Sequence, residues 1–176
     1  MKKIRLATAW LDGCSGCHMS ILDMDENILN IAKRVDVVYG PLVDAQEFPK
    51  LVDLAIIEGA VSSQDDLEKV RTIRQRSKLV VALGDCAVTA NVPGMRNQLP
   101  VRKMLERIYV DGVGESRGVP TDGVPALLRQ AVPVHEVVKV DLEVPGCPPP
   151  SQAIAYVLGE LVEGRIPDLS SKVKFG

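Results

Sequence analysis

Five apolar segments recur along the chain, and each is short enough to form one β-strand. They begin at residues 3, 35, 53, 78 and 137 and run KIRLATAWL, VDVVYGP, DLAIIEGA, KLVVALGD and VVKVDLEV. The first has apolar residues on both faces, which is typical of a buried strand in a parallel sheet. The fifth alternates, with valines and Leu142 on one face and Lys139, Asp141 and Glu143 on the other. This alternation predicts a strand over residues 137–144 near the edge of the sheet.

Between these segments, apolar residues recur at helical spacing in three places. The first helix is expected over about residues 21–34, with basic residues at its end to suit the helix dipole. Ser63 and Asp66 have the spacing of a capping box that opens the second helix. Ser151 is expected to cap the last helix, and Gly164 to follow its end. The apolar positions are Ile21, Leu22, Ile28, Leu29 and Ala32, then Leu67, Val70 and Ile73, then Ile154, Val157, Leu158, Leu161 and Val162.

Strands that alternate with helices predict an α/β fold, a doubly wound and mainly parallel five-stranded sheet. We expect a single domain over residues 1–176 with a long insertion at about residues 91–136, before the last strand. The insertion is rich in Gly and Pro around a helical piece near Val101–Ile108. So long a connection is usually functional or an interaction surface, and the alternative is a mobile surface excursion.

Composition and charge exclude some partners. Lys and Arg number 21 against 23 Asp and Glu, so the net charge of −2 gives no electrostatic basis for binding nucleic acid or an anionic membrane. No apolar run approaches the ~20 residues that span a bilayer. The charged start MKKIRLATAW continues into LDG and two cysteines, unlike a secretory signal. We therefore expect a cytoplasmic protein whose thiols are reduced.

The chain has four cysteines, and all of them follow predicted strands. Cys14 and Cys17 follow the first strand, Cys86 the fourth and Cys147 the fifth. Because the carboxyl ends of parallel strands meet along one edge of the sheet, we expect the four thiols to lie together there.

Four thiolates at one edge can hold a zinc ion or a [4Fe–4S] cluster. Structural zinc usually takes two close pairs of ligands, whereas here one pair is joined by two distant single cysteines, which favours the cluster. Two other interpretations stay open: a redox dithiol at Cys14 and Cys17, which leaves the other two cysteines unexplained, and cysteines that only fill the core.

Residues beside the cysteines suit a cluster. Gly13, Gly16 and Gly146 allow close approach of the backbone, and their N–H groups can point at an anionic group. Pro148 favours an extended Cys147 and repeats a Cys-Pro pair seen in ferredoxins.

Four further polar side chains have open roles. Glu58 ends the third strand on the same edge and is either a group near the cluster or a polar residue at a strand end. His18 either donates its ring N–H to the cluster or a partner, or lies on the surface. Asp85 is expected to serve a turn, and His135 a structural role.

Four motifs in this order, WLDGCSGCHMS, IIEGAV, LGDCAV and VPGCPPP, resemble the small subunit of [NiFe] hydrogenases over nearly the whole chain. The resemblance implies a flavodoxin-like domain in which Cys14, Cys17, Cys86 and Cys147 bind one proximal [4Fe–4S] cluster. It implies a partner large subunit with the Ni–Fe centre, and no catalytic residue in this chain.

Many members of that family have a second cysteine-rich region and a twin-arginine signal, and this sequence has neither. The resemblance is thus to the cytoplasmic NAD-reducing type, in which diaphorase subunits with flavin and iron–sulfur clusters reduce NAD⁺. The related subunit of respiratory complex I is the nearest alternative, but it has adjacent cysteines where this chain has CSGC. FMN could occupy a flavodoxin-like sheet, but we expect none because the cysteine loops fill that edge. A zinc-stabilised binding module and a flavodoxin-like carrier acting alone are the remaining alternatives.

Overall fold

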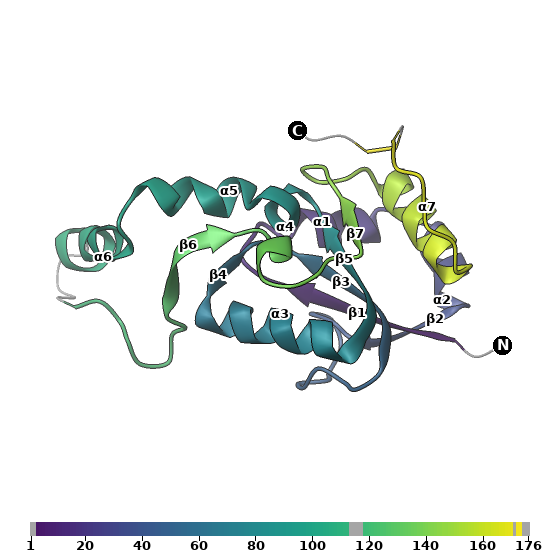
Figure 1. The fold of residues 1–176 in the computed structure, drawn as a ribbon, viewed down its shortest axis with the longest axis horizontal. Helices are drawn as coiled ribbons and strands as arrows, with labels where there is room; N and C mark the ends of the chain where they lie inside the picture. The colour runs from purple at the N-terminus through teal and green to yellow at the C-terminus, as the bar shows by residue number, and fades with distance from the viewer. Residues whose placement is uncertain (1–2, 113–117, 171, 174–176) are drawn as a thin grey trace.

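A parallel sheet lies at the centre of the protein (Figure 1), which we describe from a computed structural model over residues 3–112, 118–170 and 172–173. Its strand order is β2-β1-β3-β5-β7, and every neighbouring pair is parallel. The five strands are β1 (Ile4–Trp10), β2 (Val35–Tyr39), β3 (Val52–Glu58), β5 (Ser77–Leu83) and β7 (Leu142–Val144). The predicted doubly wound α/β fold is confirmed.

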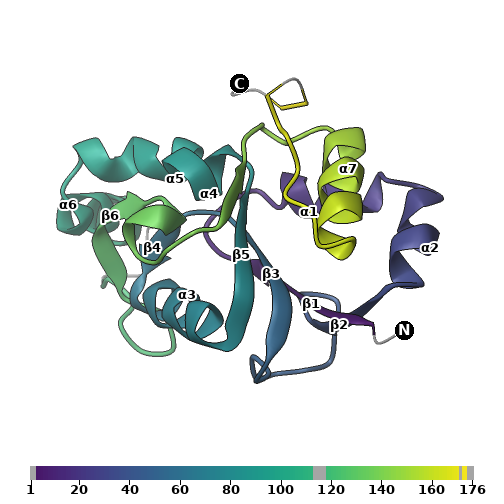
Figure 2. The same cartoon turned by 45° about the vertical axis from the view of Figure 1, so that its right-hand side comes forward.

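Helices cover both faces of this sheet (Figure 2). On one face lie α1 (Gly16–Leu22), α2 (Asn27–Ala32) and α7 (Ser151–Val162); on the other lie α3 (Gln64–Arg76) and α4 (Asp85–Thr89). Successive residues of β3 alternate between the two cores, because side chains of a strand point to opposite faces. Leu54 and Ile56 pack towards α7, whereas Ala55 and Ile57 pack towards α3.

The prediction of one continuous helix over about residues 21–34 is wrong, because the chain forms two short helices, α1 and α2, instead. Between α1 and α2, Asp25 has a positive φ of 51°, which breaks the helix. The turn lets Met24 reach the buried core at 4% exposure. Burial of this side chain outweighs the helical propensity of the segment.

The fifth strand is shorter than the alternation predicts, although its place at the sheet edge is confirmed. A 3₁₀-helix, η3, occupies Val134–Glu136, and the strand begins only at Leu142. Val138 and Val140 pack on the α3 face, whereas Leu142 and Val144 pack on the α7 face. The predicted common face for these four side chains is therefore wrong.

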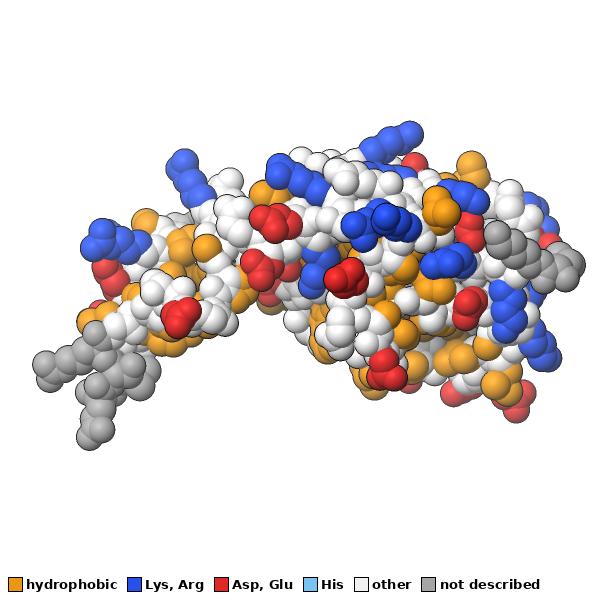
Figure 3. Space-filling view, turned by 90° about the horizontal axis from the view of Figure 1, so that it is seen from below, with side chains coloured by type: hydrophobic (Ala, Val, Ile, Leu, Met, Phe, Trp, Pro, Cys, Tyr) orange, Lys and Arg blue, Asp and Glu red, His pale blue; other side chains and the backbone are white. Residues whose placement is uncertain are grey.

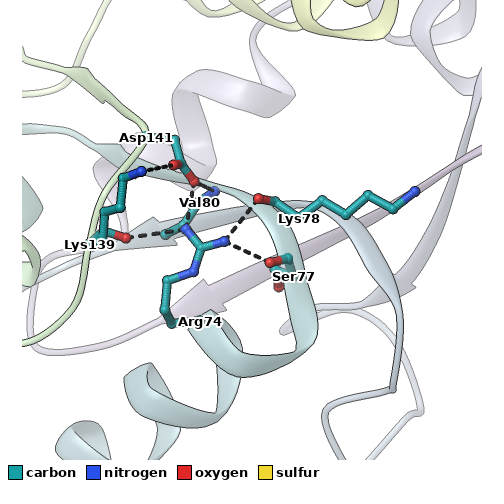
Figure 4. A network of polar contacts seen from close by, with 6 residues as sticks. All are labelled: Arg74, Ser77, Lys78, Val80, Lys139 and Asp141. Atoms are coloured by element: carbon teal, nitrogen blue, oxygen red, sulfur yellow. Dashed lines mark hydrogen bonds and ion pairs between the residues drawn. The ribbon is translucent and has the colours of Figure 1, made fainter.

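Arg74 explains where β7 begins (Figure 4). Its guanidinium donates to the carbonyls of Lys139 at 3.2 Å, Ser77 at 2.7 Å and Lys78 at 2.9 Å, and to the Asp141 carboxylate at 2.5 Å. The backbone N–H of Val80 also donates to the Asp141 carboxylate, at 2.9 Å. Backbone pairing with β5 reaches Asp141, whose N–H donates to the Val80 carbonyl at 2.9 Å, and Arg74 binds the carbonyl of Lys139 just before it.

Two of three predicted helix ends are confirmed, and the third is wrong. Ser63 Oγ accepts from Asp66 N–H, and Ser63 N–H donates to the Asp66 carboxylate, so the capping box is confirmed. Gly164, with φ of 75°, follows the last helix as expected. The predicted cap at Ser151 is wrong: Pro150 is the N-cap, and Ser151 is already in the helix.

The segment between α4 and β7 projects from the sheet. It contains α5 (Asn91–Gly94), η1 (Met95–Gln98), α6 (Val101–Glu106), the π-helix η2 (Arg107–Asp111) and β6 (Leu127–Val132). The helical piece expected near Val101–Ile108 is present as α6, and residues 113–117 of the insertion lie outside the described residues.

One pairing in this segment was not predicted: β6 pairs antiparallel with β4 (Val61–Ser63) in a separate two-stranded sheet. Figure 3 shows the projecting segment with hydrophobic side chains on it and a hollow between it and the main body. Among the described residues, no helix is both long and apolar enough to cross a membrane.

Candidate metal centre

Three loops at one edge of the sheet carry the four cysteines. Cys14 lies in the loop after β1, and Cys17 in the first turn of α1. Cys86 lies in α4, directly after β5, and Cys147 follows β7. All four are free thiols: Cys17 is buried, Cys86 is partly buried, and Cys14 and Cys147 are exposed.

Hydrogen bonds tie these loops to one another. Gly84 N–H donates to the Val144 carbonyl at 2.8 Å, which joins the ends of β5 and β7. The Ser20 hydroxyl of α1 donates to the Pro149 carbonyl at 2.6 Å, which joins the Cys17 helix to the Cys147 loop. The fold therefore brings the three loops together as the strand ends predict.

Two glycines allow close contact with sulfur. A Cβ on Gly84, whose φ is +84°, would lie 2.2 Å from Cys17 Sγ, and a Cβ on Gly16 would lie 3.3 Å from Cys14 Sγ. Sequence analysis did not single out Gly84, although its place at the end of a buried strand was a signal. Gly13 and Gly146 approach backbone instead, their Cβ positions lying 3.4 Å from Gly59 Cα and 2.6 Å from Pro149 Cα.

Glu58 holds the start of α1. This carboxylate is 2% exposed at the end of β3 and accepts hydrogen bonds from Cys17 N–H at 3.2 Å and His18 N–H at 3.0 Å. His18 Nδ1 also contacts it. The His18 ring therefore binds Glu58 through Nδ1, and among the described residues its buried Nε2 has no hydrogen-bond partner.

Asp85 plays a larger part than the expected turn. Its carboxylate is buried and accepts from Gly146 N–H at 2.6 Å, while its own N–H donates to the Gly146 carbonyl at 2.9 Å. The residue before Cys86 thus binds the residue before Cys147. His135 Nδ1 lies 3.2 Å from the Glu143 carboxylate, and its structural role stays a prediction.

The thiols lie close enough to influence one another electrostatically. Burial raises the pKa of Cys17 far above its ordinary value, and the charges of Glu58 and the other three cysteines raise it further. Burial also raises the pKa of Cys86, and the Val92 backbone N–H partly offsets this. Within the described ranges, no three His, Cys, Asp or Glu side chains are arranged around a single metal ion.

The donor set fits an iron–sulfur group. Four free thiols follow three strand ends at one edge of the sheet, two glycines leave room for two of the sulfurs, and Asn91 Nδ2 donates to a third, Cys147 Sγ. A positive metal group would stabilise the thiolates that burial and mutual repulsion disfavour here.

An apolar groove of about 490 Å³ lies beside the Cys14–Cys17 loop. Trp10, His18 and Met19 line it together with Val37 of β2 and Leu42 of the following loop. Sequence analysis did not predict this groove. The cysteine loops therefore do not fill this edge of the sheet, and the absence of FMN stays a prediction.

The model of one protein family matches most of this chain. The family described as "NADH ubiquinone oxidoreductase, 20 Kd subunit" matches residues 14–161. The chain belongs to this family. The matched residues run from Cys14 into α7 and include all four cysteines.

Within the family, the chain is most informatively compared with hydrogenase subunits. It is 38% identical to the NAD-reducing hydrogenase HoxS subunit delta of Cupriavidus necator, over 97% of this chain and 84% of that protein. It is 37% identical to a subunit of the F420-non-reducing hydrogenase of Methanothermobacter marburgensis, over 97% of this chain but only 57% of that protein. The chain also spans about three fifths of the length of the corresponding proteins of Methanocaldococcus jannaschii and Methanococcus voltae.

A solved structure is also similar to this chain. One chain of a NAD⁺-reducing [NiFe]-hydrogenase in the H₂-reduced state superposes with a TM-score of 0.95 at 36% identity, covering 99% of this chain and 100% of that one. The expected resemblance to [NiFe]-hydrogenase small subunits, and to the NAD-reducing type among them, is confirmed.

Proposed function

We propose that this chain is the electron-transfer small subunit of a NAD-reducing [NiFe] hydrogenase. In this proposal Cys14, Cys17, Cys86 and Cys147 bind one [4Fe–4S] cluster. When bound, the cluster supplies one-electron transfer between a Ni–Fe centre in a large subunit and a diaphorase module with flavin and iron–sulfur clusters. The observation that carries the proposal is that four free thiols follow three parallel strand ends at one edge of the sheet.

The chain's own residues hold the site in shape. Glu58 orients the N–H groups of Cys17 and His18, and Asp85 links the loops that carry Cys86 and Cys147. Gly84 and Gly16 leave the space that the sulfurs occupy. None of these side chains needs to react with hydrogen, because the chemistry of H₂ belongs to the partner's metal site.

A partner surface around the cysteines supports the assignment. Exposed apolar side chains flank the loops: Trp10 and Met19 beside Cys14 and Cys17, and Val92 and Met95 in the segment after Cys86. Clustered exposed apolar residues mark protein–protein contacts. A subunit that exchanges electrons at close range with a large subunit requires such a surface around its two exposed cysteines.

The comparisons favour the hydrogenase over the alternatives. The complex I relative belongs to the same family, but a TM-score of 0.95 and 38% identity to NAD-reducing hydrogenase chains support that type. Zinc and dithiol roles have no support from these relatives. The cytoplasmic location and the absence of a nucleic-acid partner stay predictions.

The test uses the complex purified anaerobically with its partner subunits. We expect about four iron and four acid-labile sulfide per copy of this chain beyond the content of the partners. Cys86→Ser should abolish H₂-dependent NAD⁺ reduction and leave NADH oxidation by an artificial acceptor unchanged, the latter being the internal control. One zinc in place of the cluster, or retained H₂-dependent activity in Cys86→Ser and Cys147→Ser, would overturn the proposal.

A further inference from the structure

The junction between α4 and α5 contains a non-glycine residue in a left-handed conformation. Ala90 has φ of 61° and is 4% exposed. It ends α4 by donating its N–H to the Cys86 carbonyl at 3.1 Å and caps α5 by accepting from Gly94 N–H at 2.6 Å. Alanine rarely adopts this conformation, so the surrounding structure must hold it there.

The insertion supplies that support. Ala90 packs with Ala60 and Ala131 in a buried cluster of small side chains. Asn97, just after α5, donates to the Ala131 carbonyl at 2.7 Å and accepts from Ala131 N–H at 2.8 Å. Because β6 carries Ala131 and pairs with β4, β6 contacts the chain at both ends of α5.

After the turn at Ala90, Asn91 lies beside a sulfur: its Nδ2 donates to Cys147 Sγ, with 3.6 Å between the atoms. The backbone N–H of the next residue, Val92, lowers the pKa of the Cys86 thiol, which burial raises. The start of α5 thus supplies a side-chain donor to one of the proposed ligands.

We infer that the Asn91 side chain tunes the reduction potential of the metal group held by Cys147 and the other three cysteines. The inference rests on the proposed function. Reduction adds negative charge to a site that is already anionic, and an N–H donor to a sulfur stabilises that charge and raises the potential. The insertion then has a role besides its surface, which is to hold this donor in place.

The test is a redox titration of the whole anaerobic complex, monitored by electron paramagnetic resonance. Asn91→Leu removes the side-chain donor. Asn91→Asp replaces the amide with a carboxylate of similar shape, which carries a negative charge. We expect Asn91→Leu to lower the equilibrium constant for reduction of the cluster by about tenfold. For a one-electron couple, this corresponds to a reduction potential about 59 mV lower. Asn91→Asp should fall at least as far, and Asn91→Gln, which keeps an amide donor, should recover part of the shift.

Asn30→Leu is the matched control, since Asn30 lies on α2 on the other face of the sheet from α4, and it should leave the potential unchanged. If Asn91→Leu and Asn91→Asp keep their iron, sulfide and spectrum and also keep the wild-type potential, the inference is wrong. If one variant loses the cluster, the other still decides. Wild-type complex without this cluster would instead overturn the proposed function.

Discussion

Asp85 and Gly146 bind each other twice, although they lie 61 residues apart in the chain. Asp85 N–H donates to the Gly146 carbonyl at 2.9 Å, and Gly146 N–H donates to the Asp85 carboxylate at 2.6 Å. Each residue directly precedes a cysteine, Cys86 or Cys147. The pair therefore sets the spacing of two proposed ligands that come from neighbouring strands.

We expect Asp85→Ala to destabilise the protein by about 2 kcal/mol, because it leaves the buried Gly146 N–H without its acceptor. Iron content after anaerobic purification should fall as well. Asp85→Asn keeps an acceptor oxygen and serves as the control, with a smaller effect on both. Urea unfolding and iron analysis measure the two outcomes, and an unchanged unfolding midpoint in Asp85→Ala would contradict this account.

Glu58→Ala should be more damaging, since three donors on Cys17 and His18 lose one buried acceptor. We expect a loss of about 3 kcal/mol in the free energy of unfolding. Glu58→Gln keeps one acceptor oxygen and should lie between this variant and wild type. Denaturant unfolding of the three proteins gives the order, and equal stability of Glu58→Ala and wild type would argue against a positioning role.

Gly84→Ala should prevent the site from forming. The new Cβ would lie 2.2 Å from Cys17 Sγ, and φ of +84° is unfavourable for any residue with a Cβ. We expect lost iron and destabilisation by more than about 1 kcal/mol.

Gly159→Ala is the matched control for this change. Gly159 lies inside α7 with open space around its Cβ position, so this variant should gain about 0.5–1 kcal/mol. Iron content and thermal unfolding of both variants test whether Gly84→Ala destabilises the protein and Gly159→Ala stabilises it. A Gly84→Ala protein with full iron would show that the backbone can move away from the sulfur.

Asp141 should make stability depend on pH in the acid range. Burial acts to raise its pKa, but hydrogen bonds from Arg74 and Val80 N–H and the charges of Arg74 and Lys139 outweigh this and lower it. A carboxyl whose pKa is lowered on folding stabilises the protein above its unfolded pKa of about 3.9 and loses that contribution as the pH falls through the folded value.

We therefore expect Asp141→Asn to lose about 1–2 kcal/mol at pH 7 and to approach wild type as the pH falls below about 4. Urea unfolding at both pH values measures the difference. An equal deficit at pH 7 and pH 3 would mean that the loss comes from packing and not from charge.

Some of the site was predictable because it follows from local rules. A cysteine after each of three parallel strands implies one shared edge, since parallel strands end on the same side. The Ser63–Asp66 capping box and Gly164 also depend only on neighbours in sequence. The break between α1 and α2 could not be predicted in this way, because it depends on the core that receives Met24. The same holds for β7, whose first residue is set by Arg74 on a distant helix.

By itself, the sequence determined the five strands of the main sheet, the edge on which the four cysteines lie and the resemblance to hydrogenase small subunits. These depend on residue spacing and on the geometry common to all parallel sheets. Only the tertiary structure decided what holds the cysteine loops: Glu58 under α1, Asp85 against Gly146, Gly84 against Cys17, and Asn91 beside Cys147. Each of these contacts joins residues 40 to 67 positions apart, or depends on a backbone turn such as that of Ala90. Such contacts form only when separate strands are packed into one sheet, so no local pattern in the chain records them.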